Sequence, residues 1–495
     1  MYKTIQIEAS EDSLFTYLQH KNIDLPAACG GSGNCGKCKV RILSAPAPLP
    51  VSSFEKSTFS KKELEEGWRL ACRQKALAGM RVQIPLSEEI QAEVNFHRDF
   101  FQGSIDPLPD FSGVLSQPVI ALDLGSTTLA AALADPLTNK ILKTASGVNH
   151  QRRWGADVIS RIEAANKGAS LALRRSICND IRNLAKKMDC ETENTSFIVS
   201  GNTTMLHLLE GLSCKGLGVA PYTPTDISLH TVDNITYLPG ISGYVGADIV
   251  SGIAACGMDQ GSELCLLLDL GTNGEMALGN KDGILVASTA AGPAFEGGNI
   301  RCGCAGIPGA IDSVSIQDSV ASIHTIDEKN PVGICGSGVL ETVYELRKNE
   351  LADESGLLVD SYFESGFPLS PDLFFTQKDI REVQLANAAI RAGIETLLAS
   401  GGFSYKDISH LYLAGGFGKK LNIEKAAGIG LLPKELLPVT EAVGNSSLAG
   451  ALLFALYPSE RPRFEKIPLL SREVILAESQ LFSRLYIDSM LFPQL

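Results

Sequence analysis

The chain has 495 residues, too many for one ordinary hydrophobic core, so we expect roughly two to four domains. Hydrophobic residues make up 44% and charged residues 20%, which is typical of a folded globular protein. The net charge of −13 argues against nucleic acids and anionic membranes as partners.

Two features predict a cytoplasmic protein that does not enter a membrane. The N-terminal segment MYKTIQIEASED lacks the apolar core of a signal peptide. The longest apolar stretch, at 448–457, is too short to span a bilayer and fits a buried helix. In a cytoplasmic chain the 12 cysteines are expected to be thiols or metal ligands rather than disulfides.

Four cysteines gather in the first 72 residues. They are Cys29, Cys35, Cys38 and Cys72, in the pattern C-x5-C-x2-C with the fourth cysteine 34 positions later. Four thiolates can hold the two irons of a [2Fe–2S] cluster. Glycines between the first three cysteines allow a tightly wrapped loop whose N–H groups point at the cluster sulfides. Lys37, inside this loop, is interpreted as a solubilising residue or as a positive charge near the cluster.

The flanking sequence predicts a small β-rich domain. Strands are expected at 4–8, 39–43 and 80–84, and a helix at 13–20 that Asp12 or Ser13 caps. A zinc site is the alternative, but zinc ribbons usually bring two C-x2-C pairs and this segment has one. Residues 1–90 resemble ferredoxins with adrenodoxin-like cysteine spacing, except for a Pro-rich insertion at 44–53 that we expect to form a surface loop.

Two later segments repeat each other without gaps when Asp123 is aligned with Asp269, so that residue 119 stands opposite residue 265. Residues 119–133 read VIALDLGSTTLAAAL and residues 264–278 read LCLLLDLGTNGEMAL. Each predicts an apolar strand that turns on glycine, hydroxyl and amide residues and returns as a second strand, so that N–H groups and hydroxyls meet phosphate oxygens at the tip. Asp123 and Asp269 occupy the same place in the two copies and can hold Mg²⁺. Two copies predict two related halves that close on one nucleotide.

A shorter echo joins GADVIS at 155–160 and GADIVS at 246–251. We interpret Asp157 and Asp248 as carboxylates in the first turns of equivalent helices, in preference to a catalytic role. A third element, LYLAGGFG at 411–418, predicts a strand running into glycines that let the backbone approach a nucleoside.

In this order, the three elements resemble the superfamily of sugar kinases, actin and heat-shock ATPases. By that resemblance the residues that contact phosphates and metal are Asp123, Gly125, Ser126, Thr127, Thr128, Asp269, Gly271, Thr272 and Asn273. Gly415 and Gly416 are expected at the nucleoside. Glu275 is a candidate for orienting the attacking water, Glu296 is a weaker candidate, and His207 is expected to make only local contacts.

The expected fold class is therefore α/β: an N-terminal β-grasp ferredoxin domain followed by an actin-like, RNase H-like duplicated ATPase domain. The expected boundaries are 1–88 for the ferredoxin domain, 89–117 for a linker and 118–495 for the ATPase domain, with halves at about 118–262 and 263–495. The pair Cys302 and Cys304 is interpreted as free thiols rather than metal ligands.

Further segments narrow the family. They are SGNTTMLHLL (200–209), APYTP (220–224), AAGPAFEGGNIRCG (290–303), GICGSG (333–338) and QLANAAIRAG (384–393). With the ferredoxin domain they resemble the reductive activators of corrinoid proteins. This resemblance implies ATP-dependent transfer of an electron from the [2Fe–2S] cluster to the Co(II) corrinoid of a partner protein, giving Co(I). It also implies Mg²⁺, an upstream low-potential electron donor and anaerobic metabolism, and leaves a homodimer open.

The chain departs from that family in two respects. Longer members carry an extra domain between ferredoxin and ATPase, for which residues 86–117 leave no room, and other relatives end in a Cys-rich tail for a [4Fe–4S] cluster. Three alternatives stay open. They are an electron-transfer activator similar to those of acyl-CoA dehydratases, a small-molecule kinase with a redox domain, and a redox-linked binding module that hardly hydrolyses ATP.

Overall fold

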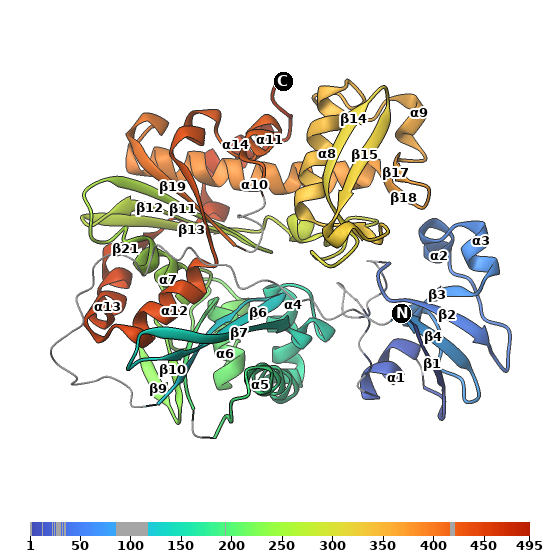
Figure 1. The fold of residues 1–495 in the computed structure, drawn as a ribbon, viewed down its shortest axis with the longest axis horizontal. Coiled ribbons are helices and arrows are strands. Elements are labelled where there is room, and N and C mark those ends of the chain that lie inside the picture. The colour runs from blue at the N-terminus through green and yellow to red at the C-terminus, as the bar shows by residue number, and fades with distance from the viewer. Residues whose placement is uncertain are drawn as a thin grey trace.

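The computed structural model describes residues 2–85 and 117–495, apart from 12, 22, 24, 26–30, 32, 34, 35, 194 and 416–420. A small N-terminal domain lies at one end, beside two larger lobes that are stacked on each other (Figure 1). The buried apolar side chains form three clusters, one of them confined to the N-terminal domain. In the described part of the chain, no helix combines the length and the apolar character needed to cross a bilayer.

The N-terminal domain is a four-stranded sheet with the strand order β1-β4-β2-β3. Strand β4 therefore lies between β1 and β2 and is antiparallel to both. The elements are β1 (Tyr2–Gln6), α1 (Leu14–His20), β2 (Lys39–Ser44), α2 (Ser53–Thr58), α3 (Lys61–Glu65), β3 (Trp68–Leu70) and β4 (Arg81–Pro85).

The elements predicted for this domain are confirmed, apart from shifts of one or two residues at their ends. Helix α1 begins after Ser13, whose hydroxyl accepts a hydrogen bond from the N–H of Thr16 at 3.4 Å. The Pro-rich insertion forms neither helix nor strand between Ser44 and Ser53, as expected. Glu55, in α2, is fully buried and accepts a bond from the N–H of Leu70 at 3.0 Å, which ties the helices after the insertion to the sheet.

The first lobe is built on a six-stranded sheet with the order β7-β6-β5-β8-β10-β9. Strand β5 reads VIALDL and is buried almost throughout, as a continuous apolar run in a central strand requires. The elements are β5 (Val119–Leu124), β6 (Thr128–Asp135), β7 (Lys140–Val148), α4 (Val158–Ala164), α5 (Ser170–Lys187), β8 (Ser196–Gly201), α6 (Thr203–Glu210), β9 (His230–Val232), β10 (Ile235–Tyr237) and α7 (Ala247–Cys256).

The second lobe is built on another six-stranded sheet, with the order β20-β19-β11-β12-β13-β21. Its strands are β11 (Leu264–Leu270), β12 (Gly274–Asn280), β13 (Gly283–Thr289), β19 (Ile408–Ala414), β20 (Thr440–Gly444) and β21 (Ser471–Glu473). The helices that follow in the sequence are α10 (Gln377–Gly401), α11 (Ile423–Gly428), α12 (Ser446–Leu456), α13 (Arg461–Leu470) and α14 (Gln480–Asp488).

A separate group of elements extends the second lobe towards the N-terminal domain (Figure 1). It contains a three-stranded sheet, β15-β14-β16, and a two-stranded hairpin, β17-β18. The elements are β14 (Ala310–Gln317), β15 (Val320–Thr325), β16 (Gly333–Ile334), α8 (Gly336–Lys348), α9 (Asp360–Phe363), β17 (Phe367–Ser370) and β18 (Leu373–Phe375).

The predicted repeat is present in the topology. In the first lobe β5 is antiparallel to β6 and parallel to β8. In the second lobe β11 is antiparallel to β12 and parallel to β19. Two hairpins with matching sequences thus occupy matching places in two sheets.

Helices α7 and α12 connect the lobes and pack closely on each other. A Cβ added to Gly450 would lie 2.3 Å from the carbonyl oxygen of Ser251, so only glycine fits there. The apolar stretch at 448–457 is buried within and just after α12, as predicted. Because α12 belongs to the second half of the sequence but packs on β5, β6 and β8, it carries residues of that half into the first lobe.

Candidate functional site

The tips of the two repeated hairpins meet between the lobes. The hydroxyl oxygens of Thr127, after β5, and Thr272, after β11, lie 3.0 Å apart. Both hydroxyls also donate to one carboxylate oxygen of Glu296, at 2.9 and 3.0 Å. The sequence-based prediction that the two tips close on one site is therefore consistent with the geometry.

Glu296 is the last residue of a short 3-10 turn, Pro293–Glu296. Burial raises the pKa of its carboxyl, and the hydrogen bonds from Thr127 and Thr272 lower it. Glu296, the weaker of the two candidates in the sequence analysis, thus bridges the tips of the two hairpins.

Asp123, at the end of β5, is held by two side chains of the other half of the chain. The amide of Asn445 donates to Oδ2 at 2.8 Å, and the hydroxyl of Ser447 donates to Oδ1 at 2.8 Å. Burial raises the pKa of Asp123, and these two hydrogen bonds lower it. Asn445 and Ser447 stand at the N-terminus of α12 and were not found in the sequence, because they lie 322 and 324 positions from Asp123 along the chain.

Asp269, the matching residue of β11, lies among other acids. Burial, followed by the charges of Asp248, Asp123 and Glu296, raises its pKa to about 8. Among the described residues no donor reaches the Asp269 carboxylate.

Asp157 and Asp248 both lie at the N-terminal ends of helices, as the sequence predicted. Asp157 does cap α4, since its carboxylate accepts a bond from the N–H of Ser160 at 2.8 Å. Asp248 accepts a bond from the N–H of Ile249 at 3.0 Å in the first turn of α7, but burial and the charge of Asp123 raise its pKa to about 7. Asp248 is therefore one of several buried acids whose charges affect one another, as well as a residue at a helix end. The repeat of 155–160 at 246–251 was the sequence signal that drew attention to it.

Glu275, the second residue of β12, completes the cluster. Only 8% of the residue is exposed, and its Oε1 has no hydrogen-bond partner among the described residues. Burial, followed by the charges of Asp248 and Asp269, raises its pKa well above the usual range. An unpartnered buried oxygen of this kind implies a ligand, a water or a proton at that place.

The acid cluster, defined as Asp123, Asp248, Asp269, Glu275 and Glu296, fits a hard cation. Carboxylates are the protein ligands that Mg²⁺ prefers, and it is usually bound by one or two of them together with substrate phosphates. In the described part of the chain no three His, Cys, Asp or Glu side chains form a ready-made metal cage. The arrangement therefore suits an ion that arrives with a phosphate ligand.

Side chains of neighbouring elements hold the tip of the first hairpin through hydrogen bonds to Ser126. Arg161, fully buried in α4, donates to the carbonyl of Ser126 at 2.5 Å, and the amide of Asn202 donates to the Ser126 hydroxyl at 3.0 Å. Burial lowers the pKa of Arg161 to about 10. A Cβ on Gly125 would lie 2.5 Å from the carbonyl of Thr128, so the turn requires glycine.

The tip of the second hairpin lies close to Gly415, which follows β19. The N–H of Gly271 donates to the carbonyl of Asn273 at 3.1 Å, which closes the turn. Gly415, at φ +101°, lies at the end of β19, where a Cβ would come 2.6 Å from the carbonyl of Leu270. Gly416 lies outside the described residues.

The cysteine site is partly described. The sulfurs of Cys38 and Cys72 lie 3.3 Å apart, and Cys38 is buried. Cys29 and Cys35 lie outside the described residues. Two thiols this close, beside a loop whose described glycines 31, 33 and 36 all have positive φ, fit thiolate ligation of iron. Arg73 fixes this loop by donating to the carbonyl of Gly33 at 2.7 Å.

Cys302 and Cys304 are partly buried free thiols. Burial raises the pKa of Cys302 and of Cys304 to about 12, which disfavours the thiolates that metals bind. No metal-type grouping occurs there among the described residues.

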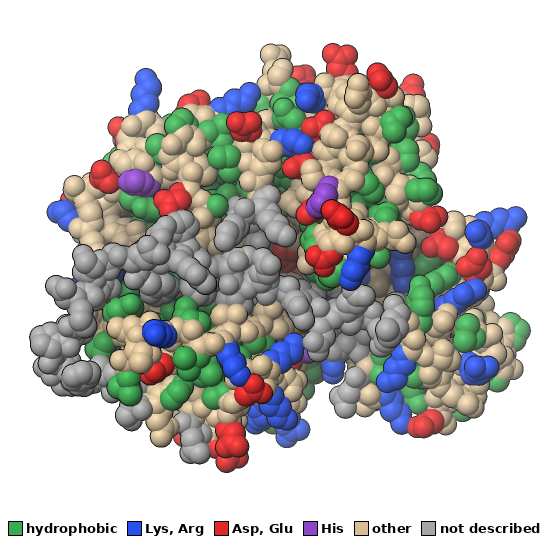
Figure 2. Space-filling model, in the orientation of Figure 1, with side chains coloured by type: hydrophobic (Ala, Val, Ile, Leu, Met, Phe, Trp, Pro, Cys, Tyr) green, Lys and Arg blue, Asp and Glu red, His purple; other side chains and the backbone are tan. Residues whose placement is uncertain are grey.

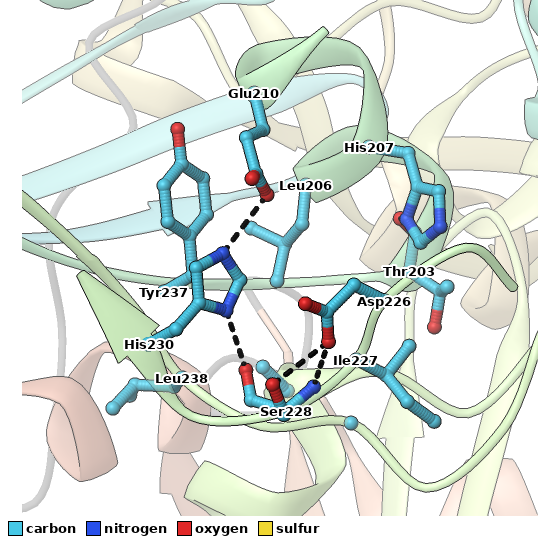
Figure 3. Close-up of a pocket in the computed structure, with 12 residues that line it drawn as sticks. Thr203, Leu206, His207, Glu210, Asp226, Ile227, Ser228, His230, Tyr237 and Leu238 are labelled. Carbon is cyan, nitrogen blue, oxygen red and sulfur yellow. Dashed lines mark hydrogen bonds and ion pairs between the residues drawn. The ribbon is translucent and has the colours of Figure 1, made fainter. Parts of the chain in front are cut away.

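His207 lines a small cavity of about 10 Å³ in the first lobe, beside His230, Glu210 and Asp226 (Figure 3). Such a cavity has room for about one water molecule. The ring nitrogens of His207 contact the carbonyl of Thr203 at 2.8 Å and the N–H of Thr225 at 2.9 Å, so its role is local, as predicted.

A cysteine-rich sheet domain followed by two lobes that meet at hairpin tips defines an iron–sulfur protein with an ATPase domain. Residues 2–77 match the family described as 2Fe-2S iron-sulfur cluster binding domain. Residues 119–261 match the RACo middle region, and residues 263–495 match the C-terminal domain of RACo, the ASKHA domain. ASKHA is the actin-like fold class, so the predicted combination with a β-grasp ferredoxin domain is confirmed.

Similar proteins agree with these matches. The chain is 32% identical over 417 residues to the corrinoid activation enzyme RamQ of Eubacterium limosum, covering 75% of this chain and 70% of that protein. It is 27% identical to the [Co(II) methylated amine-specific corrinoid protein] reductase of Methanosarcina barkeri, covering 74% and 76%. A solved structure of a reductive activator for corrinoid, iron-sulfur protein matches with a TM-score of 0.71 and 27% identity, over 98% and 96% of the two chains.

The chain belongs to the family of reductive activators of corrinoid proteins. The segment that matches the family's middle region, 119–261, is the one that we interpreted as the first half of the ATPase domain.

Proposed function

We propose that this protein uses ATP to drive one electron from its [2Fe–2S] cluster onto the Co(II) corrinoid of a partner protein, which restores Co(I). The observation that carries the proposal is the meeting of Thr127, Thr272 and Glu296 between the lobes, in a chain that also holds Cys38 and Cys72 within 3.3 Å. A nucleotide site and an electron carrier are thus joined in one molecule.

The need for ATP follows from the energetics of the electron. Plant-type [2Fe–2S] centres have potentials of about −400 mV. A Co(I) corrinoid is a stronger reductant than that, so the transfer is uphill. Nucleotide binding that closes the lobes supplies free energy only if it favours one conformation of the complex over another. The ATPase domain then acts on conformation and needs no phosphoryl acceptor.

The nucleotide site divides its work between the two tips. The hydroxyls of Thr127 and Thr272 and the N–H groups around Gly125 and Gly271 bind phosphate oxygens. Asp123 and Asp269 hold Mg²⁺ together with the phosphates, and this cation removes the mutual repulsion of the acid cluster. Glu275, whose Oε1 has no hydrogen-bond partner among the described residues, orients the attacking water. Gly415 and Gly416 approach the nucleoside.

At the other end of the molecule, Cys29, Cys35, Cys38 and Cys72 hold the [2Fe–2S] cluster, which supplies the one-electron step. Arg73 keeps the cluster loop in place through the carbonyl of Gly33. The boundaries near residues 88, 117 and 262, a cytoplasmic location and an upstream low-potential donor are parts of the same proposal.

Figure 2 shows acidic and basic side chains interspersed over the N-terminal domain and both lobes, without a wide field of one sign among the described residues of this face. This distribution supports a protein partner rather than nucleic acid.

The test is anaerobic and follows the absorbance of Co(I). Reduced holoprotein is mixed with a Co(II) corrinoid protein of the same cell, with and without Mg-ATP. We expect Co(I) only with Mg-ATP, and none with the variant Cys72→Ser, which loses the visible spectrum of the cluster but still binds ATP. Cys178→Ser, which changes a thiol in α5, is the matched control and should behave as wild type.

Co(I) formed without ATP, or by Cys72→Ser, would contradict the proposal. No Co(I) with any corrinoid protein, together with ATP turnover stimulated by a sugar or an acid, would favour the kinase alternative. Electron transfer to another metalloenzyme instead would favour an activator similar to those of acyl-CoA dehydratases.

A further inference from the structure

Lys37 connects the cluster loop to the second lobe. It stands one residue before Cys38, and its ammonium group donates to the carbonyl of Ile300 and lies 3.5 Å from that of Gly303. The first lobe is also contacted, since the amide of Gln19 donates to the carbonyl of Arg153 at 3.4 Å. The N-terminal domain therefore lies against both lobes, at the end of the molecule seen in Figure 1.

The surroundings of Lys37 on the second lobe are polar and charged. Its positive charge lowers the pKa of Asp379, although burial raises that pKa more strongly. Asp379 in turn accepts a bond from the N–H of Arg301 at 2.6 Å, which fixes the backbone beside the two carbonyls. Lys37 is thus an interface residue, a role that the sequence did not indicate.

The carbonyls that Lys37 contacts belong to the segment 293–304, which begins at the nucleotide site. Its first turn ends in Glu296, the acceptor of both threonine hydroxyls. The segment then folds back on itself, so that a Cβ on Gly303 would lie 2.0 Å from the carbonyl oxygen of Gly297. A Cβ on Gly297 would lie 2.4 Å from the carbonyl of Cys304. Such backbone contact leaves no space to absorb a shift of Glu296.

Phosphate binding has a direct effect on Glu296. Phosphate oxygens at the hairpin tips compete for the hydroxyl hydrogens of Thr127 and Thr272, and their negative charge repels the Glu296 carboxylate. Glu296 then loses two hydrogen bonds and gains a repulsive neighbour. Its displacement moves the start of the segment whose other end holds Lys37.

We propose that Lys37 is a positioning residue that couples nucleotide binding to the cluster loop through the segment 293–304. Occupation of the nucleotide site moves the carbonyls of Ile300 and Gly303 and changes the position of the Lys37 charge beside Cys38. This inference rests on the proposed function, because it takes the hairpin tips as a phosphate site and the four cysteines as cluster ligands.

The test measures the reduction potential of the cluster in the full-length holoprotein, by redox titration followed by electron paramagnetic resonance, without any corrinoid protein. Each variant is titrated with Mg²⁺ alone and with Mg²⁺ and a non-hydrolysable ATP analogue. We expect the analogue to shift the potential of wild type, and Lys37→Met to lose most of this shift. Lys3→Met, which removes the same charge from an exposed position on β1, should keep it.

No nucleotide-dependent shift in wild type that binds the analogue, or an equal shift in Lys37→Met, would overturn the proposal. Glu296→Gln acts from the other end of the segment and leaves the cluster loop unchanged, so it serves if Lys37→Met assembles no cluster. At analogue concentrations that saturate Glu296→Gln, this variant should lose most of the shift, and a full shift would contradict the coupling. Because no corrinoid takes part, failure of this inference is distinct from failure of Co(I) formation.

Discussion

The two repeated hairpins share the motif Leu-Asp-Leu-Gly and the same place in their sheets, but their surroundings differ. Asp123 accepts two hydrogen bonds, from Asn445 and Ser447. Asp269 accepts none from the described residues and lies among carboxylates that raise its pKa to about 8. The repeat places both aspartates at the site, and their neighbours decide what each can do. Asp123 is held by hydrogen bonds, whereas Asp269 is held by none from the described residues.

Among the substitutions that test this difference between the two aspartates, Asp269→Asn is expected to have the largest effect. Removing a cation ligand and its charge should lower Mg-ATP hydrolysis by about 100-fold or more. The same change removes a buried carboxyl that the folded state must hold protonated below about pH 8, so the thermal stability of the metal-free protein at neutral pH should rise. Cluster assembly should be unchanged. Hydrolysis assays and thermal melts without divalent cations measure both effects.

The matched variant is Asp123→Asn. Its amide cannot accept from both Asn445 and Ser447, so the metal-free protein should become less stable, by about 1 kcal/mol or more. Opposite signs of the two stability changes would confirm the contrast. Equal signs would show that the surroundings of the two aspartates are energetically alike.

The pH dependence of stability gives the next largest effect. The carboxyl of Asp269 has an ordinary pKa of 3.8 and a folded-state pKa of about 8, so between these values the folded state holds a proton that the unfolded state has released. The free energy of unfolding therefore falls as pH rises through this window.

Thermal melts of metal-free wild type and Asp269→Asn from about pH 5 to about pH 9, a range that spans the folded-state pKa of Asp269, measure this dependence. Wild type should lose stability more steeply with rising pH than the variant, and Mg-ATP should reduce the difference. Parallel curves without a divalent cation would show that the Asp269 carboxylate is not destabilised by its neighbours.

The smallest effect is expected from Ser447→Ala, which removes one hydrogen bond to Asp123 and one of 2.9 Å to the hydroxyl of Ser200. The loss in stability should be about 1 kcal/mol. Ser446→Ala is the control, because the neighbouring hydroxyl is buried and has no partner among the described residues. It should leave stability unchanged or raise it slightly in denaturant titrations. A greater loss from Ser446→Ala than from Ser447→Ala would contradict the assigned hydrogen bonds.

The parts of the site that the sequence predicted are those whose signal is local. Each hairpin is recognisable from a segment of fifteen residues. The cysteine spacing predicted a cluster site with four ligands, and the structure brings two of them, Cys38 and Cys72, together. The fold class followed from the order of these motifs. The roles of the individual nucleotide-site residues stay predictions.

The parts that the sequence did not predict depend on contacts between distant segments. Asn445 reaches Asp123 across 322 positions, and only the packing of α12 on the first lobe brings them together. Asp248 was interpreted correctly as a residue of a first helical turn, but a local pattern does not show that the charge of Asp123 acts on it. Lys37 is a similar case, since its partners lie 263 and 266 positions away.

The central place of β4 has a consequence for synthesis of the protein. Strand β4 ends at Pro85 and separates β1 from β2, so the N-terminal sheet cannot close until the chain has been made to that point. Domains generally fold as units, the N-terminal one first, as they leave the ribosome. All four predicted cluster ligands precede β4, and β5 begins only at Val119. The ferredoxin sheet can thus be completed, and iron inserted, before any strand of the ATPase lobes exists.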